Sequence, residues 1–124
     1  MSRSPAIVTL RTALAPQQST PDPDRLVRGK PTLRVWNYYS DDSEQFAVGI
    51  WAATRGAWRV RYTEHEFCHL LAGRIAISSE DGELWEFEEG DSFVVPAGFV
   101  GTWDVLEDCR KVYAVFEPKD RSEG

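Results

Sequence analysis

Apolar and polar residues alternate along most of the chain after residue 32, and the period is two. The clearest case is the segment 58–63, Trp-Arg-Val-Arg-Tyr-Thr, in which every second residue is apolar. Such alternation is typical of a strand with one buried face and one face in water. Further strands are predicted at 33–38, 47–54, 75–77, 84–88, 92–95, 102–106 and 110–117. With turns every ~8–12 residues, this pattern predicts an all-β sandwich or barrel.

The first 31 residues have a different character. Five of the seven prolines lie there, mixed with Ser, Thr and Gln, which favours an extended or flexible arm over a folded unit. We therefore divide the 124 residues into a flexible Pro-rich arm at 1–31, one barrel domain at 32–118 and a charged C-terminal tail at 119–124.

The charge of the chain limits the classes of binding partner that we expect, and its cysteine content indicates the cellular compartment. The net charge is −6 and no basic cluster occurs, which argues against a nucleic-acid partner. No apolar run approaches the ~18 residues of a membrane helix, so we expect no membrane partner. Cys68 and Cys109 are the two cysteines, and no convincing secretory signal precedes them. We expect reduced thiols in a cytoplasmic protein.

One motif supports two incompatible interpretations. Residues 65–69, His-Glu-Phe-Cys-His, read as H-E-x-x-H, which on a helix places two histidines and a general base around zinc in metalloproteases. On a strand, Glu66 and Cys68 share one face, while His65 and His69 share the other. The flanking segments have strand periodicity, so we favour the strand and keep the zinc metalloprotease as a remote alternative.

Two stretches resemble the sequence motifs of cupins. Residues 56–66, followed by six residues and Gly73, are similar to the first cupin motif, and residues 90–98 to the second. Residues 101–113 are similar to a subgroup of short single-domain cupins that includes the cupin domain of ureidoglycine aminohydrolase, and also to ethanolamine-utilisation cupins. The resemblance implies an all-β, single-domain cupin, which is a double-stranded β-helix or antiparallel jelly-roll barrel, here with an extended N-terminal arm.

The resemblance also indicates where a metal would bind, and the sequence departs from it there. Metal-binding cupins carry two histidines before the motif glutamate and another after the Pro-x-Gly turn, and these positions map to Val60, Tyr62 and Gly101. Of the usual four ligands only Glu66 remains, and one carboxylate does not hold a divalent transition metal. We expect no cofactor; a divalent metal, if one binds, would use Glu66, with the thiolate of Cys68 as a further donor.

Without a metal, an inward glutamate needs another partner, because a buried carboxylate must be paired or protonated. The Arg-Lys-x-Tyr pattern of the resembling subgroup places Lys111 and Tyr113 on one face of the last strand. Two interpretations stay open. The pair is either purely structural or the polar floor of a pocket. In the second case the catalytic candidates are Glu66, Lys111 and Tyr113, and the pocket is lined by Trp58, Tyr62, Cys68, Phe93 and Trp103.

These observations lead to one preferred function and two alternatives. The preferred one is a cupin that binds a small polar metabolite in the barrel, with or without converting it, so whether the protein is an enzyme stays open. The alternatives are a metalloenzyme similar to ureidoglycine aminohydrolase, with rearranged ligands around Glu66, and a non-catalytic structural or sensing cupin. Strands such as 47–53 are apolar on both faces, which predicts a second cover and therefore a homodimer.

Overall fold

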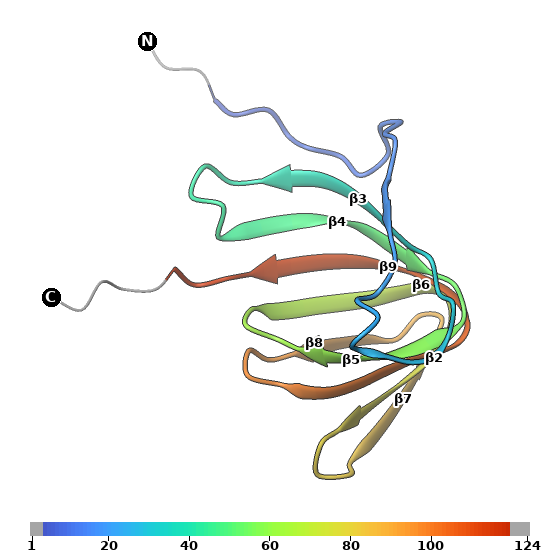
Figure 1. Ribbon diagram of the computed structural model, residues 1–124. Coiled ribbons are helices and arrows are strands. Elements are labelled where there is room, and N and C mark those ends of the chain that lie inside the picture. The colour runs from blue at the N-terminus through green and yellow to red at the C-terminus, as the bar shows by residue number, and fades with distance from the viewer. Residues whose placement is uncertain (1–3, 120–124) are drawn as a thin grey trace, which may run out of the picture.

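Two long, bent strands organise the fold. In the computed structural model, which describes residues 4–119, β6 (His65–Ser79) and β9 (Val100–Phe116) pair antiparallel along their whole length. Residues 1–3 of the predicted arm and 120–124 of the predicted tail lie outside the described residues. Because both strands bend, the sheet that they carry curls on itself (Figure 1).

The remaining strands attach to the free edges of this pair. The second half of β9 pairs with β4 (Phe46–Ala53), and its first half pairs with β5 (Gly56–Arg61). The other edge of β6 holds β8 (Ser92–Val95) and then β7 (Leu84–Glu88). All pairs are antiparallel, and β3 (Leu33–Ser40) extends the sheet beyond β4. The expected all-β, antiparallel architecture is therefore confirmed. No helix in residues 4–119 is long and apolar enough to cross a membrane.

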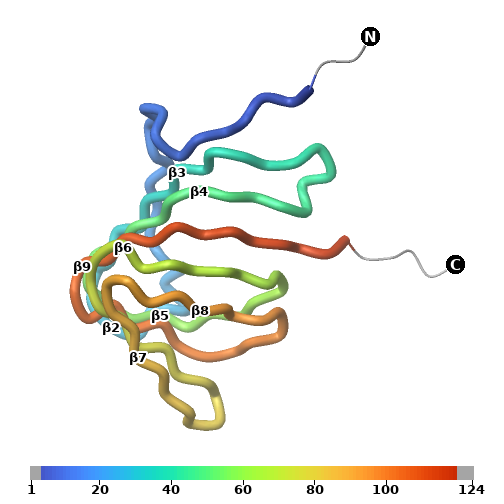
Figure 2. The backbone as a smooth tube through the Cα atoms, turned by 180° about the vertical axis from the view of Figure 1, so that it is seen from behind, coloured from blue at the N-terminus to red at the C-terminus, as the bar shows by residue number. Residues whose placement is uncertain are grey.

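Residues 17–29, inside the segment predicted as an arm, form two further strands. β1 (Gln17–Ser19) pairs with β3, and β2 (Leu26–Gly29) pairs with β5. The chain before β1 runs beside β3 at the edge of the sheet, as both views show (Figures 1 and 2). There the hydroxyl of Tyr38 donates a hydrogen bond of 2.8 Å to the carbonyl oxygen of Thr12.

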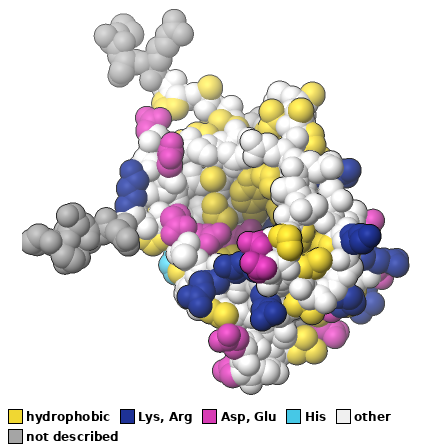
Figure 3. Space-filling view, in the orientation of Figure 1, with side chains coloured by type: hydrophobic (Ala, Val, Ile, Leu, Met, Phe, Trp, Pro, Cys, Tyr) yellow, Lys and Arg dark blue, Asp and Glu magenta, His cyan; other side chains and the backbone are white. Residues whose placement is uncertain are grey.

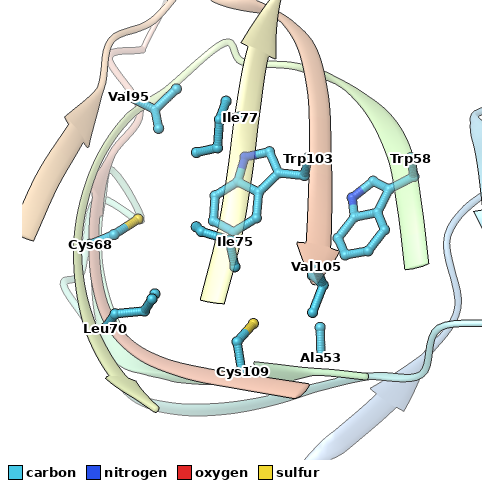
Figure 4. Close-up of a cluster of buried hydrophobic side chains, with 10 residues drawn as sticks. All are labelled: Ala53, Trp58, Cys68, Leu70, Ile75, Ile77, Val95, Trp103, Val105 and Cys109. Carbon is cyan, nitrogen blue, oxygen red and sulfur yellow. The ribbon is translucent and has the colours of Figure 1, made fainter. Parts of the chain in front are cut away.

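The interior is filled by the apolar face of the period-two pattern. Along β6, the inward side chains of Cys68, Leu70, Ile75 and Ile77 are buried, and they meet Val105 and other residues of the facing strands (Figure 4). Each fully buried aliphatic side chain of this kind contributes about 1.5–3 kcal/mol. A cavity adjoins this core, and Trp58 and Trp103 belong to both.

The backbone at the H-E-x-x-H motif is extended. Glu66 is 6% exposed and Cys68 is 0% exposed, whereas Phe67 between them is 43% exposed. His65 stacks on Phe116 at the surface, and His69 Nδ1 lies 2.7 Å from Ser92 Oγ. The strand interpretation is confirmed, and the zinc metalloprotease alternative is wrong because its two histidines point away from the glutamate.

Candidate functional site

A cavity of about 570 Å³ lies inside the curled sheet, next to the apolar core. Residues of β1, β3, β4, β5, β6 and β9 and of the connection between β5 and β6 line it: Gln17, Leu33, Val35, Asn37, Ala47, Trp51, Trp58, Val60, Tyr62, Glu64, Glu66, Trp103, Lys111, Tyr113 and Val115. Aromatic rings form much of this wall, and carboxylates border it. Figure 3 shows a hollow on this face of the molecule, with hydrophobic side chains inside it and acidic side chains beside it.

The cavity floor carries a buried ion pair. Lys111 Nζ lies 2.8 Å from Glu66 Oε2, and the two residues are 3% and 6% exposed. Both side chains point inward because Glu66 on β6 and Lys111 on β9 belong to the buried faces of their strands. Taking two charges out of water is costly, so such a pair survives only where geometry and further hydrogen bonds compensate.

Aromatic faces complete the surroundings of the ammonium group. Lys111 Nζ lies 4.5 Å from the ring centroid of Trp51 and 4.3 Å from that of Trp103. Each cation–π contact of this kind stabilises a desolvated ammonium by up to about 2 kcal/mol. Burial is the largest single effect and lowers the pKa of Lys111, but the charges and hydrogen bonds of Glu66 and Cys68 together raise that pKa above its ordinary value. Lys111 therefore keeps its proton at neutral pH.

Tyr62 and Cys68 complete the hydrogen-bond network of the pair. The Tyr62 hydroxyl donates to Glu66 Oε1 at 2.7 Å, and Lys111 Nζ donates to Cys68 Sγ at 3.4 Å. Burial raises the pKa of Cys68 to about 12, and burial with the nearby carboxylate raises the pKa of Tyr62 as well. Both groups are therefore protonated at neutral pH. Cys68 lies beneath Lys111 and does not line the cavity.

The other residues expected at the site are divided between two places. Tyr113 lines the cavity, but its hydroxyl donates to Asn37 Oδ1 at 2.6 Å instead of reaching Glu66. Trp58 and Trp103 line the same cavity. Phe93 stacks on Phe87 and lines a separate, apolar cavity of about 290 Å³. That second cavity lies between β6, β7 and β8.

The donors around Glu66 do not fit a divalent metal. Its neighbours are a lysine ammonium, a tyrosine hydroxyl and a protonated thiol, whereas transition metals take imidazole, thiolate and carboxylate ligands. Gly101, which corresponds to a histidine of metal-binding cupins, has no room for a side chain, since a Cβ there would collide with the carbonyl oxygen of Ser78. Within residues 4–119, no three His, Cys, Asp or Glu side chains come together as a metal site.

Sequence reasoning missed nine of the fifteen residues that line the cavity, and three of these nine, Trp51, Asn37 and Glu64, matter for its chemistry. Trp51 lies on β4, which is apolar on both faces, so parity does not show that its side chain points into the cavity. Asn37 reaches the cavity because the register of β3 places it opposite Gly49 and near Tyr113. This register cannot be read from the sequence of β3 alone. Glu64 precedes β6 in a turn, and the period-two pattern gives no signal there.

Comparison with known proteins agrees with this geometry. A protein of unknown function of the DUF861 family from Pseudomonas syringae pv. tomato is 28% identical, with a TM-score of 0.76, over 87% of this chain and 46% of its own. Clostridium difficile EutQ is 13% identical, with a TM-score of 0.64, over 72% of this chain and 65% of its own. Ectoine synthase from P. lautus is 13% identical, with a TM-score of 0.60, over 70% of this chain and 65% of its own.

The chain spans about half the length of the Pseudomonas protein, and the likeness to EutQ and to ectoine synthase shows the fold alone. No curated protein matches the sequence. Residues 40–113, more than half of the chain, match the family described as the EutQ-like cupin domain. The chain therefore belongs to the EutQ-like cupin family.

Proposed function

We propose that the protein binds a small polar metabolite in the barrel cavity, with the Glu66–Lys111 ion pair in place of the usual cupin metal. The observation that carries the proposal is the position of this pair on the wall of a cavity of about 570 Å³. Ligand sites are concave, mostly apolar and equipped with a few fixed polar groups. The aromatic wall and the polar floor meet that description.

The floor offers fixed hydrogen-bonding groups to a ligand. Glu66 accepts one hydrogen bond at each carboxylate oxygen, from Tyr62 and from Lys111, and a carboxylate oxygen can accept a second. Asn37 holds the Tyr113 hydroxyl at 2.6 Å, and its amide nitrogen is a donor. A polar molecule that fills the cavity would exchange hydrogen bonds to water for hydrogen bonds to these groups.

The alternative of a metalloenzyme similar to ureidoglycine aminohydrolase has less support. It requires a metal on Glu66, yet a lysine ammonium lies 2.8 Å from that carboxylate. An ammonium next to the carboxylate repels a second cation. Stoichiometric zinc, manganese or nickel in the purified protein would favour this alternative over ours.

Native mass spectrometry tests the proposal. We expect the purified protein to carry a bound small polar molecule, or to take one up from a metabolite mixture, and the Val60→Trp variant to lose it because the larger side chain fills the cavity. Val60 is suited to this test because it lines the cavity but takes no part in the hydrogen bonds of the ion pair.

The matched control is Arg59→Trp, which places the same side chain on the exposed face of the same strand. This variant should bind as the wild type does. If the wild-type protein takes up no polar molecule, the proposal is wrong and a structural cupin is favoured. If Val60→Trp binds equally well, the ligand binds outside this cavity and the proposal is wrong as well.

A further inference from the structure

The charges on the cavity wall are unequal. Two carboxylates, Glu64 and Glu66, and one ammonium, Lys111, are the charged groups among the described residues that line it. Glu66 and Lys111 neutralise each other at 2.8 Å. The wall therefore carries one net negative charge, and this charge belongs to Glu64.

Glu64 has no cationic partner within residues 4–119. Its Oε1 accepts a hydrogen bond of 3.1 Å from the backbone N–H of Thr63, and none of the salt bridges in that range includes it. The side chain is half-buried. A half-buried carboxylate on a cavity wall attracts a positive group more strongly than one in open water, because the local dielectric constant is lower.

Lys111 is not free to form an ion pair with an anionic ligand. It is 3% exposed, it donates to Glu66 and Cys68, and the rings of Trp51 and Trp103 cover it. A carboxylate or phosphate in the cavity would meet the uncompensated Glu64 before it met a free cation.

The aromatic wall adds to the preference for a cation. Trp58, Tyr62 and Tyr113 line the cavity together with the two tryptophans next to Lys111. Aromatic faces attract ammonium groups, most strongly where water is excluded. Negative charge and aromatic faces thus act in the same direction.

We propose that the ligand is a small polar amine, whose ammonium group pairs with Glu64 beside the aromatic wall and whose polar remainder lies toward Glu66 and Asn37. This inference rests on the proposed function and specifies the ligand class of the same cavity. It assigns Glu64 as the residue that determines specificity, and Glu66 with Lys111 as the fixed floor.

Three probes with one skeleton test the charge preference. These are 3-aminopropan-1-ol, which is a cation at neutral pH, propane-1,3-diol, which is neutral, and 3-hydroxypropanoate, which is an anion. Binding is followed by NMR through the indole N–H signals of the five tryptophans. Trp51, Trp58 and Trp103 should shift, whereas Trp36 and Trp85, which do not line the cavity, should not.

We expect the amine to bind roughly tenfold more tightly than the diol, and the anion to bind most weakly. Glu64→Gln should abolish the preference for the amine, so that the amine and the diol bind with similar affinity. The control Glu86→Gln removes an exposed carboxylate of β7 outside the cavity, and it should behave as the wild type.

The outcomes separate the two proposals. If the diol or the anion binds as tightly as the amine, or if Glu64→Gln retains the preference, the amine inference is overturned while ligand binding stands. If none of the three probes shifts the cavity tryptophans, ligand binding itself is contradicted, and the inference with it.

Discussion

Lys111 and Glu66 form an ion pair in the protein interior, where burying either charged side chain without the other would be strongly unfavourable. Both are nearly fully buried, and Tyr62, Trp51 and Trp103 occupy the space around them. Removing one partner of such a pair leaves an unpaired buried charge, whereas removing both leaves none. The network therefore has to be tested as a unit.

We expect Lys111→Met to lower the free energy of unfolding by about 3–5 kcal/mol, because it leaves the Glu66 carboxylate unpaired. The double variant Glu66→Gln, Lys111→Met should recover most of that loss, since no uncompensated charge remains. Urea denaturation of the two single variants and the double variant measures the coupling. Additive losses would show that the two side chains do not interact.

The buried thiols give the protein a defined pH response. Burial raises the pKa of Cys68 to about 12 and that of Cys109 to about 11, from an ordinary value of 9.0. Above pH 9 the unfolded chain loses these protons while the folded protein keeps them, so the unfolded state is favoured. The free energy of unfolding should hold up to about pH 9 and then decline, and Cys68→Ala should decline less steeply.

Thiol labelling checks the same property directly. The folded protein at pH 8 should resist iodoacetamide, because both thiols are buried and protonated. Both should react after unfolding in urea, as mass spectrometry would record. Rapid labelling of Cys68 in the folded protein would contradict the buried network.

The bend in β6 depends on a glycine. Gly73 has φ +92°, and a Cβ there would collide with the carbonyl oxygen of Asp108 and lie 2.7 Å from Cys109 Cα. The register of β6 against β9 shifts between Leu70 and Ile75, so the bend lies where the two strands approach closely. Because β6 bends at this point, its first half pairs with β8 and its second half pairs with β7.

Gly73→Ala and Gly82→Ala separate conformational strain from steric clash. Gly82 has φ +95° but nothing within 4 Å of an added Cβ, so its alanine variant should lose only about 1–2 kcal/mol of unfolding free energy. Gly73→Ala carries the same strain and the clash, so its loss should be larger. Equal melting temperatures for the two variants would show that the bend tolerates a side chain.

Period-two patterning predicts most of the sheet, including the parity of β6 and the resulting burial of Glu66. It fails for β1, because Gln17–Ser19 is polar and pairs only through its backbone with β3. It also fails for cavity residues on a strand that is apolar on both faces, such as Trp51 on β4. Pairing partners and cavity walls depend on contacts between distant segments, which local periodicity does not encode.

The outer face of the molecule carries apolar side chains that the monomer leaves exposed. Phe67 is 43% exposed and Val94, its neighbour on β8, is 59% exposed. In the strand register, Phe116 lies opposite His65 on one side and Phe46 on the other, so all three side chains lie on the same outer face. Phe46 and Phe116 are both exposed. Phe46, Phe67, Val94 and Phe116 thus form a group of exposed apolar side chains on one face of the sheet, and such a patch marks an interaction surface.

We propose that a second copy of the chain covers this patch in a two-fold symmetric dimer, because one self-complementary patch suffices for such an interface. Light scattering at micromolar concentration should give the mass of a dimer for the wild type. Phe67→Arg should give a monomer, and the control Glu86→Arg, on the β7 hairpin, should not. A monomeric wild type would contradict the dimer.

The central claim for the whole molecule is that an ion pair replaces the metal at the floor of the cavity. Elemental analysis by plasma mass spectrometry tests it most directly, on protein incubated with zinc, manganese and nickel and then freed of unbound ions. We predict far less than one metal ion per chain, because Lys111 occupies the position beside Glu66. One tightly held ion per chain, lost in Glu66→Gln, would contradict the account.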